Sequence, residues 1–444
     1  MKKFLAFLLT AVMILSLSVI GTSAAADKWD GTVAASFESG TGSEADPFVI
    51  KTASQLAFLA ASVEAGNTYA GQYFVLASDI DLAKIEWTPI GVYLGKSSTA
   101  NVAFAGNFDG QGYTISGVQI TSDTKSLYVG LFGYVSTTGY IKNIIIADSS
   151  ISSGTAASRY AGAVAGKMEA KVVSSLVVKE DVTVSSGGSA GGVCGRIVGA
   201  DAKYLINYAT VSTAVVDSSG FGGGVAGTVG GGATLEYAVN YGTVSGLGAF
   251  HGGVVGITGG DSGAGALKNC VNFADVTYNG EKSWYVGGVA GCFGHTANFD
   301  YNNENCINLG KVTAGFDGAA VGEIIGEARK GTINMKSIYS VDLENINLIG
   351  KESTAPATLE DVVNKTADEL ATLADAIATA AEAGIVYAVS APETTEPAPE
   401  TTEPTPETTE PPVSSETGDS FVIFAAIAAV SVLGIAVISK RREN

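Results

Sequence analysis

A six-residue glycine-rich box recurs seven times between about Tyr128 and Leu343, and it constrains the fold more than any other feature of this 444-residue chain. Successive boxes are 33, 29, 32, 29, 35 and 35 residues apart, measured between their last glycines. These glycines are Gly133, Gly166, Gly195, Gly227, Gly256, Gly291 and Gly326. A unit of this length cannot bury its own apolar face and must stack on its neighbours. The sequence therefore predicts a solenoid over residues 128–343.

The segment after each box indicates which kind of solenoid this is. In VKEDVTV (178–184) and NYGTVSG (240–246), Val, Thr and aromatic residues alternate with small or polar ones. A period of two is typical of β-strands. We therefore predict an all-β fold, a parallel β-helix with short helical caps at its two ends.

Four of the segments begin with asparagine: Asn207, Asn240, Asn272 and Asn308. Coils that stack about 4.8 Å apart would place these amides above one another, where they can bond along the stack. Asparagine also tolerates the left-handed backbone of a sharp corner. We expect the box glycines to serve another corner, where a side chain would clash. Both columns are interpreted as structural, with a ligand surface on the asparagine face as the alternative.

The first 127 residues contain an export signal and the start of the solenoid. Residues 1–26 are typical of a secretory signal peptide, with Lys2 and Lys3 before an apolar stretch and a small-residue cleavage site. An uncleaved anchor is the alternative. Residues 27–127 are predicted to form an N-terminal cap and the first coils. Apolar residues of Ser54–Glu64 recur at helical spacing, and we expect this helix to cover the first open sheet edge.

The C-terminal part changes character three times. Residues 344–390 are predicted to form a second helical cap, because Thr358–Gly384 carries apolar residues three and four apart. Residues 391–417 repeat PETTEP and predict a disordered, extended stalk. Residues 418–444 contain an apolar run long enough to cross a bilayer, followed by a basic cluster. This order predicts a protein on the extracellular face of a cell envelope.

Several motifs carry a resemblance to a known family. The runs GSEADPFVIKTASQLAFLA, YFVLASDIDL, WTPIG, FAGNFDGQGYTISGV and YVGLFGYV, followed by NYGTVSG-type repeats, resemble the GLUG-motif surface proteins of Gram-positive and other bacteria. The resemblance extends from Trp29 to Leu343. It implies a right-handed parallel β-helix on an exported, often cell-wall-attached protein, and it supplies no shared catalytic residues.

The C-terminal tail resembles a sortase sorting signal. Thr417 and Gly418 match the end of the LPxTG pattern, and Ser414 and Ser415 stand where Leu and Pro belong. Covalent wall attachment after Thr417 and a retained membrane anchor are both open on these residues.

Few residues offer catalytic or metal-binding chemistry. The cysteines are Cys194, Cys270, Cys292 and Cys306. We interpret them as buried thiols, with disulfide pairing as the alternative. Cys270 and Cys306 each lie two residues before a ladder asparagine and are expected to be neighbours. The chain has no CxxC, HExxH or GxSxG motif.

Charged residues near turns give the weak alternatives. Asp79 and Asp81 are expected on the same side of a strand and Asp109 in a turn. Ca²⁺ binding or paired-carboxylate catalysis would use such groups, and a turn-forming Asp-Gly is the default interpretation. His251 and His295 are expected on surface loops. Arg159, Arg196 and Arg329 lie near different coils. We predict no catalytic residue and no cofactor, with Ca²⁺ as the one candidate ion and a polysaccharide lyase or glycosidase as the enzymatic alternative.

Charge and repetition favour a binding function. A net charge of −19 argues against nucleic acid as a partner. Repeated surfaces make many weak contacts that add up in avidity. We therefore predict a monomeric, non-enzymatic adhesin or binding module that presents a repetitive face to glycans, a host or neighbouring cells, with a structural spacer as the alternative. Aromatic residues that could stack on sugars, or pack in the core instead, are Tyr204, Tyr208, Tyr241, Phe273, Tyr278, Trp284 and Tyr285.

Overall fold

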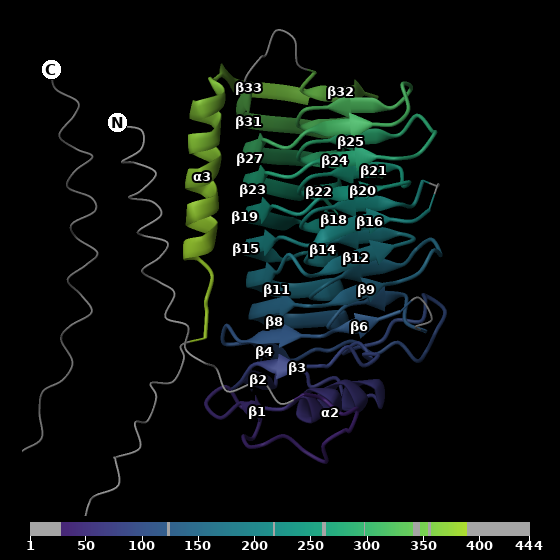
Figure 1. Cartoon of the computed structure of the whole chain (residues 1–444), viewed down its shortest axis with the longest axis vertical. Helices are drawn as coiled ribbons and strands as arrows, with labels where there is room; N and C mark the ends of the chain where they lie inside the picture. Colours follow the sequence, from purple (N-terminus) through teal and green to yellow (C-terminus); the bar gives the residue numbers. More distant parts are fainter. Residues whose placement is uncertain are drawn as a thin grey trace, which may run out of the picture. The chain divides into compact units, whose positions relative to one another are not determined.

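The computed structural model describes residues 28–121, 125–215, 218–259, 263–296, 298–340, 347–353 and 357–388. These residues belong to one compact unit, a parallel β-solenoid built from three sheets (Figure 1). The predicted signal peptide, stalk, sorting signal and membrane span lie outside the described residues. Among the residues that are described, no helix has the length and apolar character needed to cross a membrane.

Two of the sheets have seven strands each. The glycine sheet contains the first halves of the boxes, and the hydroxyl sheet contains the Val/Thr-rich segments. The strands of the glycine sheet are β7 (Tyr128–Val129), β10 (Tyr160–Gly162), β13 (Ser189–Gly191), β17 (Phe221–Gly223), β21 (Phe250–Gly252), β25 (Tyr285–Gly287) and β29 (Ala320–Gly322). Those of the hydroxyl sheet are β6 (Gln119–Ile120), β9 (Ser150–Ser152), β12 (Thr183–Ser186), β16 (Thr210–Thr213), β20 (Val244–Gly246), β24 (Val276–Tyr278) and β28 (Val312–Ala314).

The third sheet, here the large sheet, has 19 strands and supplies two strand positions in most coils. Its strands in the first coils are β1 (Phe48–Ile50), β2 (Tyr73–Leu76), β3 (Ile80–Asp81), β4 (Asn107–Asp109), β5 (Thr114–Ser116), β8 (Phe132–Ala147) and β11 (Ala165–Val178). The later ones are β14 (Cys194–Val198), β15 (Asp201–Asn207), β18 (Ala226–Gly230), β19 (Ala233–Asn240), β22 (Val255–Thr258), β23 (Gly265–Asn272), β26 (Ala290–Phe293), β27 (Asp300–Asn308), β30 (Ile325–Ala328), β31 (Thr332–Ser340), β32 (Ile349–Glu352) and β33 (Ala357–Asn364).

Each coil pairs with the next one in register. The coil made of β17, β18, β19 and β20 lies under β21, β22, β23 and β24, and all four pairings are parallel. Inward-facing valines and other apolar residues of successive coils are buried in one continuous core. Coiling begins at β1, before the first glycine box, as the strand-like runs near residues 73–120 predicted. The solenoid also continues to β33, past the predicted boundary at Leu343.

The box glycines are required by close packing and not by backbone conformation. A β-carbon added at Gly256 would lie 2.6 Å from the carbonyl oxygen of Gly227, and one at Gly291 would lie equally close to that of Gly256. None of the seven box-ending glycines has a positive φ. The predicted clash is therefore confirmed.

The expectation of a left-handed corner at the asparagines is wrong, because that conformation lies three residues earlier in each coil. Its positions are Tyr204, Tyr237, Asn269 and Asn305.

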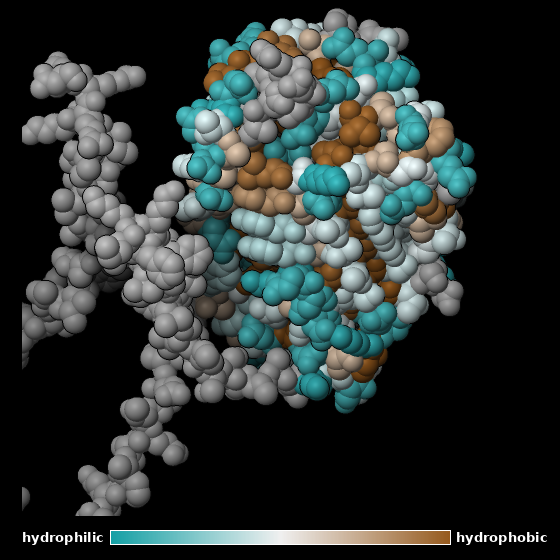
Figure 2. All heavy atoms as spheres, turned by 45° about the horizontal axis from the view of Figure 1, so that its top comes forward, coloured by the Kyte–Doolittle hydropathy of each residue, from teal (hydrophilic) through white to brown (hydrophobic). Residues whose placement is uncertain are grey.

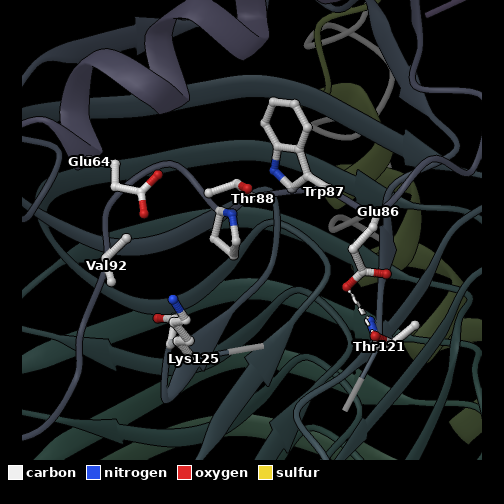
Figure 3. Close-up of a pocket in the computed structure, with 9 residues that line it drawn as sticks. Glu64, Glu86, Trp87, Thr88, Val92, Thr121 and Lys125 are labelled. Carbon is white, nitrogen blue, oxygen red and sulfur yellow. Dashed lines mark hydrogen bonds between the residues drawn. The ribbon is translucent and has the colours of Figure 1, made fainter. Parts of the chain in front are cut away.

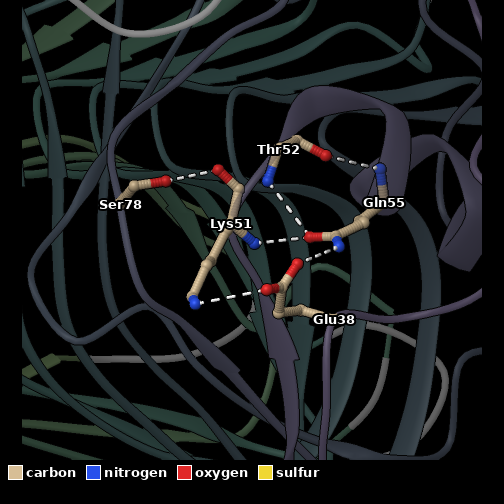
Figure 4. A network of polar contacts seen from close by, with 5 residues as sticks. All are labelled: Glu38, Lys51, Thr52, Gln55 and Ser78. Carbon is tan, nitrogen blue, oxygen red and sulfur yellow. Dashed lines mark hydrogen bonds and ion pairs between the residues drawn. The ribbon is translucent and has the colours of Figure 1, made fainter.

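Helix α2 (Ala53–Glu64) confirms the predicted N-terminal cap. Thr52 is the N-cap and forms a capping box with Gln55. The Gln55 amide also donates to Glu38, which pairs with Lys51 at 3.5 Å (Figure 4). Apolar residues of α2, among them Leu56 and Leu59, are fully buried in the core. The helix thus lies at the N-terminal end of the stack (Figure 1).

The predicted second cap is wrong in both position and extent. Residues 357–364 form strand β33, and helix α3 (Ala367–Ala383) begins only after the N-cap Thr366. The helix lies along the side of the stack and packs on β15, β19 and β23 (Figure 1). The physical reason is an outward-facing apolar column, which includes Ile206 and Val239, that matches the apolar stripe of α3. Docking along this column buries apolar surface of both the helix and the coils, which stabilises the folded state.

Strand β33 forms the far edge of the large sheet. Among the described residues it pairs with β31 alone, and Leu359, Val362 and Val363 on it are 37%, 37% and 41% exposed. Figure 2, which turns this end of the solenoid forward, shows hydrophobic patches among hydrophilic ones. The chain then returns with α3, and the backbone N–H of Ala388 donates to the carbonyl of Gly112 at 3.1 Å. The end of the described chain therefore lies beside the early coils.

Candidate binding surfaces

The four predicted asparagines form a ladder inside the solenoid. Asn207, Asn240 and Asn272 each donate from Nδ2 to Oδ1 of the next asparagine at 2.8 Å. Each side chain also closes a local turn, as when Asn240 donates to the carbonyl of Gly242 at 2.7 Å. All four are at most 2% exposed. The structural interpretation is confirmed, and the alternative of a ligand surface on this face is wrong because no external ligand reaches these amides.

The aromatic residues form columns of stacked rings. Tyr208, Tyr241 and Phe273, one residue after each ladder asparagine, stack at centroid distances of 4.8 and 4.7 Å. Their ring faces cover one another, so only the ring edges face outward. Helix α3 lies against this column, and burial with nearby acidic groups raises the pKa of Tyr241 to about 12. Stacked faces that are already occupied are poor platforms for a sugar ring.

The remaining predicted aromatics are also packed. Tyr204 stacks on Tyr237 at 5.6 Å, and Tyr285 stacks on Phe250 at 5.2 Å with the Arg329 guanidinium 5.6 Å from its centroid. Tyr278 is fully buried, and Trp284 packs partly buried against its cluster. These positions favour core and ladder packing over sugar binding.

The side chains of the three predicted aspartates accept hydrogen bonds from backbone N–H groups. Asp79 accepts from the N–H of Thr114 at 2.8 Å, and Asp81 accepts from that of Ala83 at 2.7 Å. Asp109 accepts from Gln111 N–H at 2.9 Å and forms an ion pair with Lys142 at 3.2 Å. Asp81 and Asp109 each close a local turn, which confirms the turn-forming interpretation for Asp109, whereas Asp79 bonds across to the next coil. In the parts of the chain that the structure describes, no three His, Cys, Asp or Glu side chains are grouped to hold a metal.

The cysteines are buried free thiols, as the first interpretation predicted. Cys270 and Cys306 are register neighbours on β23 and β27, which confirms the expected proximity. Burial raises the pKa of Cys194, so its thiol is a poor nucleophile.

His251 does not lie on a surface loop as expected. It lies in β21, fully buried, with Nε2 2.9 Å from Thr213 Oγ1, and burial lowers its pKa to about 4. The coil register places position 251 in line with Gly222 and Val286, inside the stack. His295 is partly exposed and packs T-shaped against the rings of Phe221 and Phe250, at centroid distances of 5.1 and 5.2 Å.

The arginines stay apart. Arg159 donates to the carbonyl of Ser126 at 3.3 Å, Arg196 donates to the Tyr160 hydroxyl at 3.2 Å, and Arg329 pairs with the buried Glu327 at 2.7 Å. Each arginine bonds to a different partner.

A regular array of hydroxyl groups covers the outer face of the hydroxyl sheet. We call this array the hydroxyl grid. One column contains Ser150, Thr183, Thr210 and Thr243, and the other contains Ser152, Ser185, Ser212, Ser245, Thr277 and Thr313. Between them, buried Val184, Val211 and Val244 point into the core. The recurring T-V-S triplet is visible in the sequence, although sequence reasoning took it only as a strand signal.

The spacing of the grid follows from sheet geometry. Coils repeat every 4.8 Å or so, and residues two apart in a strand are separated by about 6.7 Å. Thr183, Thr210 and Thr243 are exposed, and the serines of the second column are half-buried. Neighbouring hydroxyls also bond along the stack, as Ser185 does to Ser152 at 3.1 Å. Over the coils from Ser150 to Thr243 the result is an uncharged surface of donors and acceptors, and in the last two coils the outer column continues with Asp275 and Lys311.

A pocket lies at the N-terminal end of this grid. We call it the end pocket; it measures about 410 Å³ and is lined by Glu64, Glu86, Trp87, Thr88, Pro89, Val92, Thr121, Lys125 and Ser126. Figure 3 shows Glu64 and Val92 on one side, Glu86 and Thr121 on the other, and Thr88 between them. Glu86 Oε1 accepts from the backbone N–H and the hydroxyl of Thr121, at 2.9 and 3.1 Å. Glu86 to Pro89 are consecutive and overlap the WTPIG motif, but no motif links this run to Glu64 at the helix end or to Thr121, Lys125 and Ser126 farther along the chain.

Comparisons with known proteins identify the fold of this chain but not its family. No family model matches it. A protein of Evansella cellulosilytica, provisionally named a Gly-rich membrane protein, is 33% identical over 116 residues, which cover 24% of this chain and 12% of that protein. Halomucin of Haloquadratum walsbyi is 28% identical over 144 residues, which cover 31% of this chain and 2% of halomucin. The match thus spans a small part of each relative.

A solved structure from Bacteroides ovatus, described as a candidate immunoglobulin A1 protease, is similar to most of the solenoid. The TM-score is 0.50 at 23% identity, over 77% of this chain and 90% of that chain. At this identity the likeness establishes the fold, a parallel β-solenoid.

Proposed function

We propose that this protein is a non-enzymatic binding module of the cell envelope, a right-handed β-solenoid whose hydroxyl grid binds a linear polysaccharide. The grid is the observation that carries the proposal. It is a repetitive outward face, and its period along the stack is that of a sheet, which suits a ligand with its own short repeat. Many weak hydroxyl contacts add up in avidity along such a polymer.

Several features support an exported location. The export-signal pattern of residues 1–26 and the apolar run Phe421–Ser439 with its basic flank predict that the solenoid lies outside the cell. One relative carries the words membrane protein in its name. We propose anchoring through this tail, by sortase cleavage after Thr417 or as a retained span, with the chain as a monomer.

Binding to insoluble polysaccharides tests the proposal. Residues 27–390 would be incubated with cellulose, chitin and peptidoglycan, and the bound fraction measured. Replacing Thr183, Thr210 and Thr243 together by Val removes three hydroxyls and keeps the shape and strand propensity. We expect at least tenfold weaker binding by this variant.

A matched control uses three threonines on the large sheet, Thr234, Thr332 and Thr358, which are partly or fully exposed. Their replacement by Val should leave binding unchanged. Equal binding by both triple variants would mean that the polysaccharide binds to another surface. If no polysaccharide binds at all, the result would favour the structural spacer.

Catalysis is the second candidate, favoured by the two carboxylates of the end pocket, Glu64 and Glu86. Glycosidases use a pair of carboxyl groups about the scissile bond. Release of reducing ends from the bound polysaccharide, abolished by Glu86→Gln, would establish this activity in place of simple binding.

A further inference from the structure

The end pocket and the hydroxyl grid are continuous. Glu86 forms a parallel bridge with Gln119, and Gln119 pairs with Ser150, the first residue of the outer grid column. Thr121 follows Ile120, which pairs with Ile151, so Thr121 precedes Ser152 at the head of the second column. A glycan that lies along the grid and runs toward α2 would therefore end in this pocket.

The charges in the pocket favour a cation. Glu64 and Glu86 provide two carboxylates against the single ammonium group of Lys125. Glu64 is the last residue of α2, and the C-terminal end of a helix carries partial negative charge. The Thr121 bonds hold the Glu86 carboxylate in place. These groups stand at the head of a grid whose first members, Ser150 and Ser152, are uncharged.

The size and the apolar lining suit a single ring. At about 410 Å³, the pocket falls in the range of about 300–1,000 Å³ typical of small-molecule sites. Val92, with the buried Trp87 and Pro89 beside it, supplies apolar lining, and the exposed Thr88 and Thr121 supply hydroxyls. A sugar has the same mixture, with C–H groups on its ring and hydroxyls at its rim.

We propose that the end pocket binds an amino sugar with a free primary amine, held through Glu64 and Glu86, as the terminal residue of the glycan on the grid. The placement on a longer glycan rests on the proposed function; the binding of the amino sugar itself does not. The carboxylates pair with the ammonium group, and the pocket stops the chain at its charged end.

Calorimetric titration of residues 27–390 with glucosamine and with N-acetylglucosamine tests the pocket alone. Acetylation removes the positive charge and keeps the ring. We expect glucosamine to bind at least tenfold more tightly, and the Glu64→Gln/Glu86→Gln variant to lose this preference. The amide oxygen of glutamine can still accept from Thr121, and unchanged circular dichroism and thermal unfolding would show that the variant is folded. Equal binding of the two sugars, or no binding of glucosamine, overturns the proposal.

Two further variants sharpen the result. Glu304→Gln removes an exposed carboxylate on β27, far along the stack, and should leave the preference unchanged. Lys125→Met removes the like charge and should strengthen glucosamine binding; weaker binding would contradict an ammonium site.

Longer β-1,4-linked glucosamine oligomers then connect the two sites. The Thr183/Thr210/Thr243 variant should bind the oligomers more weakly and glucosamine normally. If glucosamine binds and no polymer does, the pocket proposal stands and the grid proposal fails. If polymers bind without any preference for the amine, the reverse holds.

Discussion

Asn308, the last amide of the ladder, donates from Nδ2 to Oε1 of Glu323 at 3.1 Å. Glu323 occupies the box position that is glycine at Gly288 in the coil below. A β-carbon at Gly288 would lie 2.3 Å from Cγ of Asn308, and the same clash recurs between Gly253 and Asn272. Position 323 accommodates a side chain, and its carboxylate accepts the hydrogen bond that Asn308, the last asparagine of the ladder, donates.

Removing a ladder amide should destabilise the solenoid strongly. Asn240→Ala deletes the acceptor of Asn207 and the donor to Asn272, and both partners stay buried. Buried groups without partners cost about 1–3 kcal/mol each. We expect a loss of unfolding free energy on the order of 3 kcal/mol by urea titration. The neighbouring, half-buried Thr234→Ala is the control, and a similar small effect of both variants would contradict the ladder's role.

Stability should fall as pH rises past the ordinary range of a glutamate because of Glu323. Burial raises the pKa of Glu323, with the bond from Asn308 opposing it. The folded state then binds a proton more readily than the unfolded chain just above the usual glutamate pKa, so ionisation there costs stability. Glu323→Gln keeps an acceptor for Asn308 and should remove this dependence. Thermal unfolding from pH 4 to 7 measures it, and identical profiles for the two proteins would refute the assignment.

His251 should act in the opposite sense. Burial lowers its pKa from 6.5 to about 4, so below pH 6.5 the unfolded chain binds a proton that the folded protein does not. Stability is then lost as pH falls through this window, on the order of 3 kcal/mol between pH 7 and 4. NMR titration of the imidazole gives a direct check. An ordinary midpoint near 6.5 would mean that the ring is not buried in solution.

The stability of the solenoid should depend on the alternating charges along the outer face of the large sheet. Lys203, Glu236, Lys268, Glu304 and Lys336 stand in register on successive coils, and Lys203 and Glu236 are 2.6 Å apart. Lys268→Glu would place three carboxylates in a row and should cost about 1 kcal/mol at low salt. Lys268→Gln should cost less. The difference should shrink in 1 M salt, where the screening length is about 3 Å; a salt-independent difference would point to packing.

One candidate site could be predicted from the sequence and the other could not. The T-V-S triplets of the grid can be read from the chain, because every second residue of a strand faces one side. The end pocket cannot, because Glu64 comes from a helix end and Glu86 and Lys125 come from different coils. Their meeting depends on how α2 closes the stack.

The sequence by itself was enough to predict the stacked coils of the solenoid. The glycine boxes and asparagines recur with a period that only stacking satisfies, and Thr52 with Gln55 specifies the start of α2 through local hydrogen bonds. The tertiary structure decided where α3 docks, that β33 forms the far sheet edge and that His251 is buried. These outcomes depend on surfaces built by several coils together. A helix finds its place by the apolar area it can bury, and no single repeat contains that area.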